Sequence, residues 1–359
     1  MRDDRLRVAY TLEQCWHDVP GGTAVAALAL ADAIVALGDI ELIAVAGRHR
    51  NAPSSDVRPS MRVRQLPLRR PWLYETWNRW GRPKVERVTG PIDVCHSTLA
   101  IPAGTDAPHV VTVHDIACVH TPDRFSRHGA RVMRAGLERC RDATLIACPS
   151  HVTRNDLMYL GFDPGRVRVV PWGVTTTAVG QADIDRVRAT YDLPDQFVLF
   201  VGTVEPRKNL ARLVAAISQT DCQLPLVIVG ASGWGDQGAD RDARFLGFVP
   251  TVDLDAIYSA ATVFAYPSLQ EGFGMPVAEA LAHGVPVVTS RDTSAEEVAG
   301  DAAVLVDPTD VASIASGIDE ALERAEILRV AGQARAAMFS WQACAEAMVA
   351  MYREAADTT

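Results

Sequence analysis

The chain has 359 residues, which favours two domains over one. Apolar residues make up 48% of it, enough for a large core, yet no apolar run reaches the roughly 20 residues that a membrane-spanning helix needs. The cysteines number seven, an odd count without a C-x-x-C pair, which argues against a disulfide framework and against a zinc site.

The charge of the chain is unevenly distributed. The net charge is −9, yet residues 48–87 hold eleven basic residues against Asp56, Glu75 and Glu86, so this segment alone carries +8. The first residues, MRDDRLRVAY, run straight into a strand pattern without a charged-then-apolar leader, so a cytoplasmic protein is expected. No nucleic-acid partner is expected.

The first half of the chain alternates strand and helix patterns. We expect a strand at Leu6–Leu12, a helix at Thr23–Leu37 and a strand at Ile40–Gly47. This order is a βαβ unit and predicts a parallel sheet. Gly21 and Gly22 precede the helix, and a tight turn explains this pair as well as an anion at the helix N-terminus does.

Residues 48–87 break the alternation and are both basic and aromatic. The aromatic side chains of the central stretch are Trp72, Tyr74, Trp77 and Trp80. The spacing places Leu73, Trp77 and Trp80 on one helical face. Two interpretations stay open: a surface that meets an anionic acceptor or the headgroups of a membrane, or a short helix that packs its aromatic residues into its own domain.

His114 and Asp115 follow a strand expected at residues 109–113. Residues at the carboxyl ends of parallel strands line the ligand crevice of an open α/β sheet, so His114 is placed for chemistry. It could equally satisfy a backbone group or cap the next turn. Ser150 is expected to cap a helix.

The strand–helix pattern restarts after a linker at residues 172–194. A strand at Phe197–Val201 leads into GTVEPRKNL and a helix at Asn209–Ser218. Lysine occurs in the chain only at Lys84 and Lys208. A lysine in an arginine-rich chain is suited to act as a compact point charge on a flexible stem, although chance explains its presence equally well.

The most informative stretch is residues 263–290, VFAYPSLQEGFGMPVAEALAHGVPVVTS. A strand leads through the glycines of EGFG into a helix whose first turn contains Pro276. Backbone N–H groups at such a helix start attract an anion. Glu271 and Glu279, eight positions apart, are suited to accept hydrogen bonds from sugar hydroxyls on either side of a bound diphosphate. Together these features describe a nucleotide-sugar site.

With these motifs in order, the chain resembles the retaining glycosyltransferases of family 4, which have the GT-B fold. The resemblance is strong in the second half and looser in the first. It is carried by the E-x7-E pair Glu271 and Glu279, VGTVEPRKN at 201–209, LGFV at 246–249, HD at 114–115, GGT at 21–23, and the closing FSW before a helix.

The resemblance implies an α/β fold with two Rossmann-like domains that face each other across a cleft. The acceptor-binding domain would comprise residues 1–172, joined by a C-terminal helix at about 341–359 that crosses back to it. The donor-binding domain would comprise residues 173–340.

The resemblance also implies the roles of individual residues. Glu279 would hold the ribose hydroxyls and Glu271 the donor sugar, while Lys208 with Arg207 would neutralise the leaving diphosphate. His114 would contact the sugar or its phosphate. The expected catalytic residues are therefore Glu271, Lys208, Arg207 and His114. The donor-binding set is Glu279, Gly272, Phe273, Gly274, Met275, Pro276, Gly202, Thr203, Val249 and Gly22. The acceptor-binding set is Trp16, His17, Asp18 and Asp115.

The chain departs from the family at Thr203, where many members carry an arginine that binds phosphate, so more of this task falls on Arg207 and Lys208. The expected reaction moves a hexose-type sugar from a nucleoside-diphosphate sugar to a hydroxyl of a glycan or lipid-linked acceptor, with retention by a front-face route. GDP-mannose and UDP-sugars are the favoured donors, and a dTDP-sugar stays open. Neither a metal nor a cofactor is expected, and peripheral contact with the inner face of the membrane is possible.

Other functions on the same scaffold stay open. The chain could be a sugar phosphorylase, a transferase-like enzyme that joins non-sugar rings, or a non-catalytic relative that acts as a binding partner. A dinucleotide oxidoreductase fits poorly, because no G-x-G-x-x-G follows the first strand. The sequence does not set the oligomeric state.

Overall fold

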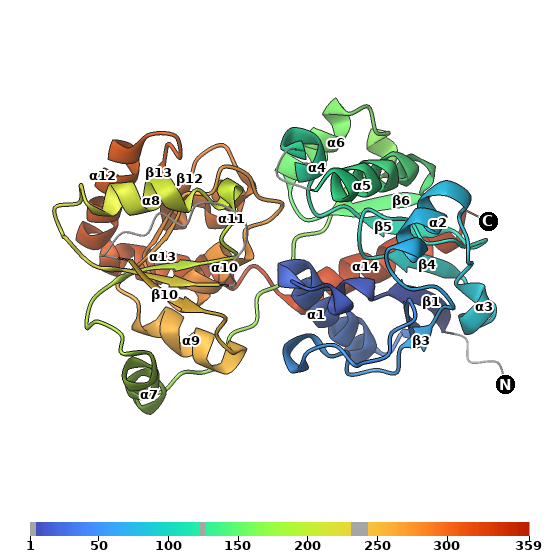
Figure 1. Cartoon of the computed structure of the whole chain (residues 1–359), viewed down its shortest axis with the longest axis horizontal. Coiled ribbons are helices and arrows are strands. Elements are labelled where there is room, and N and C mark those ends of the chain that lie inside the picture. Colours follow the sequence, from blue (N-terminus) through green and yellow to red (C-terminus); the bar gives the residue numbers. More distant parts are fainter. Residues whose placement is uncertain (1–4, 123–125, 231–242, 359) are drawn as a thin grey trace. The chain divides into compact units, whose positions relative to one another are not determined.

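The computed structural model describes residues 5–122, 126–230 and 243–358. It divides into two compact units: unit 1 comprises Met1–Gly173 with Trp341–Thr359, and unit 2 comprises Val174–Ser340. The sequence placed these divisions after residues 172 and 340. Each unit is built on one parallel β-sheet with helices packed on it, as Figure 1 shows.

The sheet of unit 1 has seven strands in the order β3-β2-β1-β4-β5-β6-β7. Its strands are β1 (Leu6–Thr11), β2 (Ile40–Ala46), β3 (Arg64–Gln65), β4 (Val94–Ser97), β5 (His109–Thr112), β6 (Leu145–Cys148) and β7 (Val167–Val169). Adjacent strands pair in parallel, with Leu6 opposite Ile40 and Val8 opposite Val94. The central strands are buried apolar runs because helices cover both faces of such a sheet.

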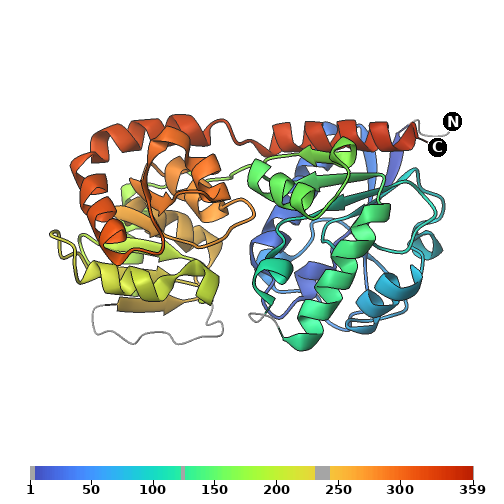
Figure 2. The ribbon, with the colours of Figure 1, turned by 90° about the horizontal axis from the view of Figure 1, so that it is seen from above.

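The helices of unit 1 are α1 (Gly21–Leu37), α2 (Trp72–Trp80), α3 (Glu86–Thr89), α4 (Ala117–His120), α5 (Arg127–Arg139), α6 (His151–Tyr159) and α14 (Trp341–Ala356). Ser150 caps α6 as expected, since its side chain accepts a hydrogen bond from the amide of Thr153. The predicted return of the C-terminal helix is confirmed: α14 packs on α1, and Figure 2 shows it running along unit 1. Tyr352 of α14 is buried, and its hydroxyl lies 2.7 Å from Nδ1 of His96 in β4.

The spacing that places Leu73, Trp77 and Trp80 on one helical face does not decide which of them are buried. Leu73 and Trp77 are buried, as is Tyr74, whereas Trp80 is exposed. The reason lies in the residue that follows α2. Gly81 adopts a left-handed conformation with φ of 59°, and the chain folds back so that the carbonyl of Pro83 accepts a hydrogen bond from the indole of Trp77. The returning chain covers Trp77 and leaves Trp80 at the surface.

The sheet of unit 2 has six strands in the order β10-β9-β8-β11-β12-β13. They are β8 (Val198–Val201), β9 (Leu226–Val229), β10 (Ala243–Gly247), β11 (Val263–Tyr266), β12 (Val287–Ser290) and β13 (Ala303–Val306). The helices are α7 (Gln181–Tyr191), α8 (Leu210–Ile217), α9 (Thr251–Ala260), α10 (Met275–Ala282), α11 (Ser294–Ala299), α12 (Val311–Glu323) and α13 (Ala325–Ala336).

The strand order in unit 2 reverses between β8 and β11, which lie side by side. Ligands of open α/β sheets bind outside the carboxyl ends of the strands at such a switch point. The motifs GTVEPRKN and EGFG follow these two strands, so the fold brings together two segments that are about sixty residues apart in sequence.

Candidate active site

The loops after β8 and β11 are joined by backbone and side-chain hydrogen bonds. The carbonyl of Arg207 accepts from the amide of Leu269 at 2.8 Å, and its oxygen lies 3.0 Å from the hydroxyl oxygen of Ser268. The side-chain amide of Asn209 donates to the carbonyl of Pro267 at 2.9 Å. These contacts fix Lys208 opposite the loop that carries Glu271.

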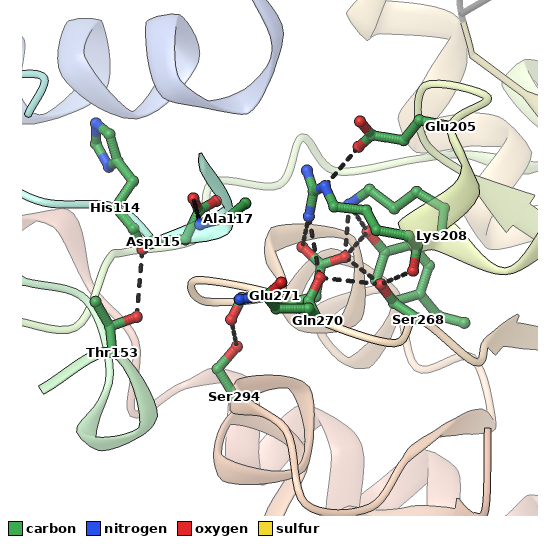
Figure 3. Close-up of polar contacts among 12 residues, drawn as sticks. His114, Asp115, Ala117, Thr153, Glu205, Lys208, Ser268, Gln270, Glu271 and Ser294 are labelled. Carbon is green, nitrogen blue, oxygen red and sulfur yellow. Dashed lines mark hydrogen bonds and ion pairs between the residues drawn. The ribbon is translucent and has the colours of Figure 1, made fainter. Parts of the chain in front are cut away.

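A buried ionic cluster lies where these loops meet, and Figure 3 shows Lys208, Ser268 and Glu271 directed at one another. The Nζ of Lys208 lies 2.7 Å from Oε1 of Glu271 and also contacts the hydroxyl of Tyr266. The hydroxyl of Ser268 donates to the same Oε1 at 2.6 Å. A guanidinium nitrogen of Arg207 lies 3.1 Å from Oε2. Both oxygens of Glu271 therefore accept from cations.

The cluster shifts the pKa values of both members of the ion pair. Burial disfavours ionised Glu271, but the charges of Lys208 and Arg207, with hydrogen bonds from Lys208 and Ser268, outweigh burial and lower its pKa to about 2. Burial lowers the pKa of Lys208, and Arg207 lowers it further, while Glu271 opposes the shift. Glu271 is thus ionised at neutral pH and helps to keep Lys208 protonated.

Arg207 is shared between two carboxylates. Its Nε lies 2.7 Å from Oε1 of Glu205, and its terminal nitrogen reaches Glu271. Sequence reasoning did not find Glu205, Tyr266 or Ser268. In the sequence these residues are marked only by their position at or after the carboxyl ends of β8 and β11. The strand order shows that these two ends are neighbours.

The N-terminus of α10 lies next to this cluster in sequence and is shaped by Gly274. Gly274 has a φ of 100°, in the left-handed region, and a β-carbon there would lie 3.3 Å from the Cα of Ala295. Pro276 falls in the first turn, as predicted. The hydroxyl of Ser294 donates to the backbone carbonyl of Glu271 at 2.8 Å. The backbone from Gly272 to Met275 is therefore held at the start of a helix, where anions are stabilised.

Glu279 lies on α10, eight positions after Glu271 in the sequence. Its Oε2 accepts a hydrogen bond from the hydroxyl of Tyr258 at 2.8 Å. Burial raises the pKa of Glu279, and the bond from Tyr258 opposes the shift. Tyr258 is itself stacked on His283, with ring centroids 5.6 Å apart and planes inclined by 8°. Tyr258, which the sequence did not reveal as a site residue, orients the Glu279 carboxylate.

The remaining predicted donor residues of unit 2 follow the strands β8 and β10; they are Gly202, Thr203 and Val249. Gly202 follows β8. A β-carbon on Gly230 would lie 1.9 Å from the carbonyl oxygen of Gly202, so the segments after β8 and β9 approach closely. Thr203 is next in the chain, and Val249, which follows β10, is buried.

His114 lies in unit 1 after β5 and is half-buried. Its Nε2 lies 2.7 Å from the carbonyl oxygen of Thr98, which fixes the hydrogen on Nε2. Burial lowers its pKa, against the bond to Thr98 and the charge of Asp115. Nδ1 is buried and has no hydrogen-bond partner among the described residues. The neutral ring therefore presents Nδ1 as an acceptor.

The three predicted acceptor residues between β1 and α1 each contact a different residue of unit 1. The indole of Trp16 donates to the carbonyl of Asn51 at 2.9 Å and stacks on His49, with centroids 4.5 Å apart. His17 Nε2 lies 2.8 Å from the hydroxyl of Tyr74, and the exposed Asp18 lies 3.7 Å from Arg70.

Asp115 and Gly22 take local structural positions. A carboxylate oxygen of Asp115 accepts from the amide of Ala117 at 3.0 Å at the start of α4, and Figure 3 shows this turn. Gly22 lies in the first turn of α1.

Two further buried polar residues follow β1. Glu13 accepts hydrogen bonds from the amide of Gly47 at 2.6 Å and pairs with His49 at 3.0 Å. Gln14 donates to the hydroxyl of Thr98 at 2.7 Å. Sequence reasoning missed both, because an acid and an amide after a strand carry no motif of their own.

In residues 5–122, 126–230 and 243–358, no group of three or more His, Cys, Asp and Glu residues is arranged to hold a metal ion. Among the helices in these ranges, none combines the length and the apolar character that crossing a bilayer requires.

Family models match both halves of the chain. The model described as Glycosyltransferase Family 4 matches residues 20–178, and the one described as Glycosyl transferases group 1 matches residues 182–337. The O-antigen chain mannosyltransferase B of Escherichia coli is 34% identical over 265 residues, which cover 68% of this chain and 70% of that protein.

Two more similarities extend the comparison. A D-inositol 3-phosphate glycosyltransferase of Segniliparus rotundus is 33% identical over 226 residues, and the match covers 55% of this chain and about half of that protein, 49%. The crystal structure of Anabaena Alr3699/HepE in complex with UDP and glucose superposes with a TM-score of 0.73, covering 98% of this chain and 100% of the other at 18% identity.

Proposed function

Because the chain belongs to the family 4 glycosyltransferases and has their GT-B fold, we propose that it moves a hexose from a nucleoside-diphosphate sugar to a hydroxyl of a glycan or lipid-linked acceptor. The observation that carries this proposal is the buried cluster of Lys208, Arg207 and Glu271 at the switch point of the unit 2 sheet. It combines cations for a diphosphate with a carboxylate for sugar hydroxyls.

GDP-mannose is the first candidate donor. The E. coli relative with 34% identity is a mannosyltransferase, which supports a mannosyl donor. A UDP-sugar is the second candidate, because the structural neighbour from Anabaena binds UDP and glucose on the same fold.

The chemistry follows from the charges that develop when the sugar–phosphate bond breaks. Negative charge grows on the diphosphate and positive charge on the sugar ring, so preorganised cations and dipoles near the leaving oxygens lower the barrier. In our proposal Lys208 and Arg207 supply the cations, and the N-terminus of α10 supplies the dipole. These groups do the neutralising without a metal ion or cofactor.

Retention by a front-face route is the mechanism we propose. Lys208 and Arg207 bind the two oxygens of ionised Glu271 and balance its charge, which makes the carboxylate a weak nucleophile. Glu271 would accept from hydroxyls of the donor sugar, and Glu279 from the ribose. The departing phosphate oxygen would take the proton of the acceptor hydroxyl.

His114 would bind a sugar hydroxyl rather than a phosphate. Its Nε2–H is engaged by the carbonyl of Thr98, and the neutral ring leaves a lone pair on Nδ1. A lone pair accepts the hydrogen of a hydroxyl and repels a phosphate oxygen. This chemistry selects one of the two roles that the family resemblance left open.

A hydrolysis screen tests the proposed reaction directly. The protein is incubated with GDP-mannose, UDP-glucose, UDP-N-acetylglucosamine and a dTDP-sugar, in the presence of a chelator, and released nucleoside diphosphate is measured. We expect release from one of them, with GDP-mannose first, undiminished by the chelator. Release that requires added divalent metal would contradict metal independence, and formation of sugar 1-phosphate from a disaccharide and inorganic phosphate would favour a phosphorylase instead.

A further inference from the structure

The outer face of α2 carries two large aromatic side chains that nothing in the described structure covers. Trp72 is 64% exposed and Trp80 is 63% exposed, whereas Tyr74 and Trp77 of the same helix are buried. Tryptophan has an apolar body and a polar N–H, so it is favoured at membrane–water interfaces. The structure thus divides the aromatic residues of this stretch into a structural pair and a surface pair.

Cations surround the exposed pair. The guanidinium of Arg79 lies 5.2 Å from the ring centroid of Trp80. Further exposed arginines in the segments that flank α2 pair with no carboxylate among the described residues; they are Arg69, Arg82 and Arg87. Two of the nearby acids are already paired, because Glu75 lies close to Arg131 and His128, and Asp106 pairs with Lys84.

The charge of the segment that contains α2 is opposite to that of the whole protein. Residues 48–87 carry +8 in a chain of net charge −9, so the remaining residues carry −17. An anionic surface would therefore attract this segment and repel the rest of the chain, which orients the protein as well as binding it.

A groove adjoins Trp80 and combines apolar and cationic walls. It has a volume of about 490 Å³ and is lined by Pro67, Leu68, Thr76, Trp80, Arg82, Pro83, Lys84 and Arg87. A free phosphate ion would be bound by the cations alone and would leave the apolar wall of the groove without a partner. Cations at the edge of an apolar groove beside the exposed indole of Trp80 fit an amphiphile with an anionic headgroup.

The inner face of α2 contacts the loop that the sequence assigned to the acceptor. The hydroxyl of Tyr74 lies 2.8 Å from Nε2 of His17, in the segment between β1 and α1. The two faces of one helix therefore serve different surfaces: the outer face meets solvent, and the inner face holds the acceptor loop.

We propose that Trp72, Trp80, Arg69, Arg79, Arg82 and Arg87, here called the α2 surface, dock the protein on a bilayer that contains anionic phospholipids. Docking would present a membrane-embedded, lipid-linked acceptor to the loop of His17. This second step rests on the proposed function, whereas the docking itself does not.

Vesicle co-sedimentation tests the docking. Wild-type protein is mixed with vesicles of phosphatidylcholine alone and with vesicles that also contain phosphatidylglycerol. We expect binding to the anionic vesicles only, weakened by salt. Arg79→Gln with Arg82→Gln should lower the partition coefficient roughly 25-fold, at about five-fold for each cation near the surface. Trp72→Ser with Trp80→Ser should lower it at least as much.

Matched variants outside the α2 surface serve as controls. Tyr159→Ser removes an aromatic side chain that is 88% exposed on α6, and Arg329→Gln removes an exposed cation on α13. Both should bind anionic vesicles like the wild type. Wild-type protein that ignores phosphatidylglycerol, or α2 variants that bind as well as the controls, would overturn the proposal.

Two further readouts separate this proposal from the others. Inorganic phosphate at the same ionic strength as sodium chloride should compete no better than the salt; specific competition would show a phosphate site and overturn bilayer docking. Donor hydrolysis in solution should be unchanged in Trp72→Ser with Trp80→Ser. If hydrolysis fails in the wild type while vesicle binding succeeds, the proposed function falls and the docking stands.

Discussion

Lys208 and Glu271 form a buried ion pair, with 2.7 Å between Nζ and Oε1 and exposed fractions of only 7% and 8%. Neither charge would be stable there alone, since burial of an unpaired charge is costly. The pair therefore holds a cation in place at the carboxyl edge of the sheet before any donor arrives, and it makes each residue dependent on the other.

Replacement of Lys208 by methionine should lower turnover about 10²–10³-fold, the usual loss when one group that stabilises developing charge is removed. Methionine keeps much of the side-chain volume without the charge. Nucleoside diphosphate release at saturating donor measures the effect. Arg329→Gln, which removes an exposed cation on α13, should leave turnover unchanged. Near-wild-type turnover in Lys208→Met would remove Lys208 from the site.

The same ion pair predicts that two substitutions destabilise less than one. Lys208→Met leaves Glu271 with Arg207 as its remaining cation and should cost about 3 kcal/mol of unfolding free energy. Adding Glu271→Gln removes the buried charge and should recover part of that loss, while activity stays low. Urea unfolding of the two single variants and the double variant gives the coupling energy. Additive losses would show that the pair is not coupled.

Glu271→Gln should move the alkaline limit of donor binding to lower pH. Burial lowers the pKa of Lys208, and the Glu271 charge opposes that shift, so removal of the charge lowers the pKa further. Lys208 then loses its proton, and its attraction for a diphosphate, at a lower pH than in the wild type. Calorimetric titration with GDP across the alkaline range measures the limit. An unmoved limit would mean that Lys208 does not bind the diphosphate.

Tyr258→Phe should weaken nucleotide binding through Glu279. The hydroxyl of Tyr258 orients the Glu279 carboxylate at 2.8 Å, and one such bond to a charged group contributes about 1.5–3 kcal/mol, or roughly 10- to 150-fold in affinity. Glu279→Gln should weaken binding as well, and Glu271→Ala should reduce turnover more than affinity.

A nucleotide without ribose hydroxyls distinguishes orientation of Glu279 from a general loss of structure. The 2′,3′-dideoxy analogue of GDP should bind wild type and Tyr258→Phe equally, because the carboxylate then has no hydroxyl to accept from. If Tyr258→Phe weakens binding of the analogue as much as binding of GDP, the role of Tyr258 is not exerted through the ribose.

Glu271 should also make the stability of the fold depend on pH in the acid range. Its pKa falls from 4.5 to about 2 in the folded protein, so ionised Glu271 stabilises the fold above pH 4.5. This contribution is lost as the pH falls from about 4.5 to about 2, where the folded-state carboxylate takes up its proton. Unfolding free energies measured by urea across this range should fall in the wild type more steeply than in Glu271→Gln. Equal slopes would show that the depressed pKa is absent.

Local signals were sufficient for much of the fold. Apolar runs separated by helical patterns predicted parallel α/β sheets, and Pro276 and Gly284 marked the two ends of α10, where Gly284 has a left-handed φ of 67°. The position of Ser150 just before a helical pattern correctly predicted its capping hydrogen bond. These features depend on residues a few positions apart, which is why the sequence alone reveals them.

The orientation of α2 could not be obtained in this way. Its periodicity placed Trp80 with Leu73 and Trp77, but the turn at Gly81 brings Pro83 back against Trp77 and leaves Trp80 exposed. Which aromatic residues of a short amphipathic helix are covered depends on the chain that returns over it, and periodicity holds no information on that path.

By itself the sequence determined the class of fold and the order of the motifs, and it predicted Glu271, Glu279, Lys208 and Arg207 as residues of a nucleotide-sugar site. Only the tertiary structure decided that Lys208 and Arg207 both bind Glu271, and that Tyr266, Ser268, Glu205 and Tyr258 hold the cluster and its neighbour in place. The physical reason is that these contacts join the ends of strands and helices far apart in the chain, and distances between such ends are set by strand order and burial rather than by spacing in sequence.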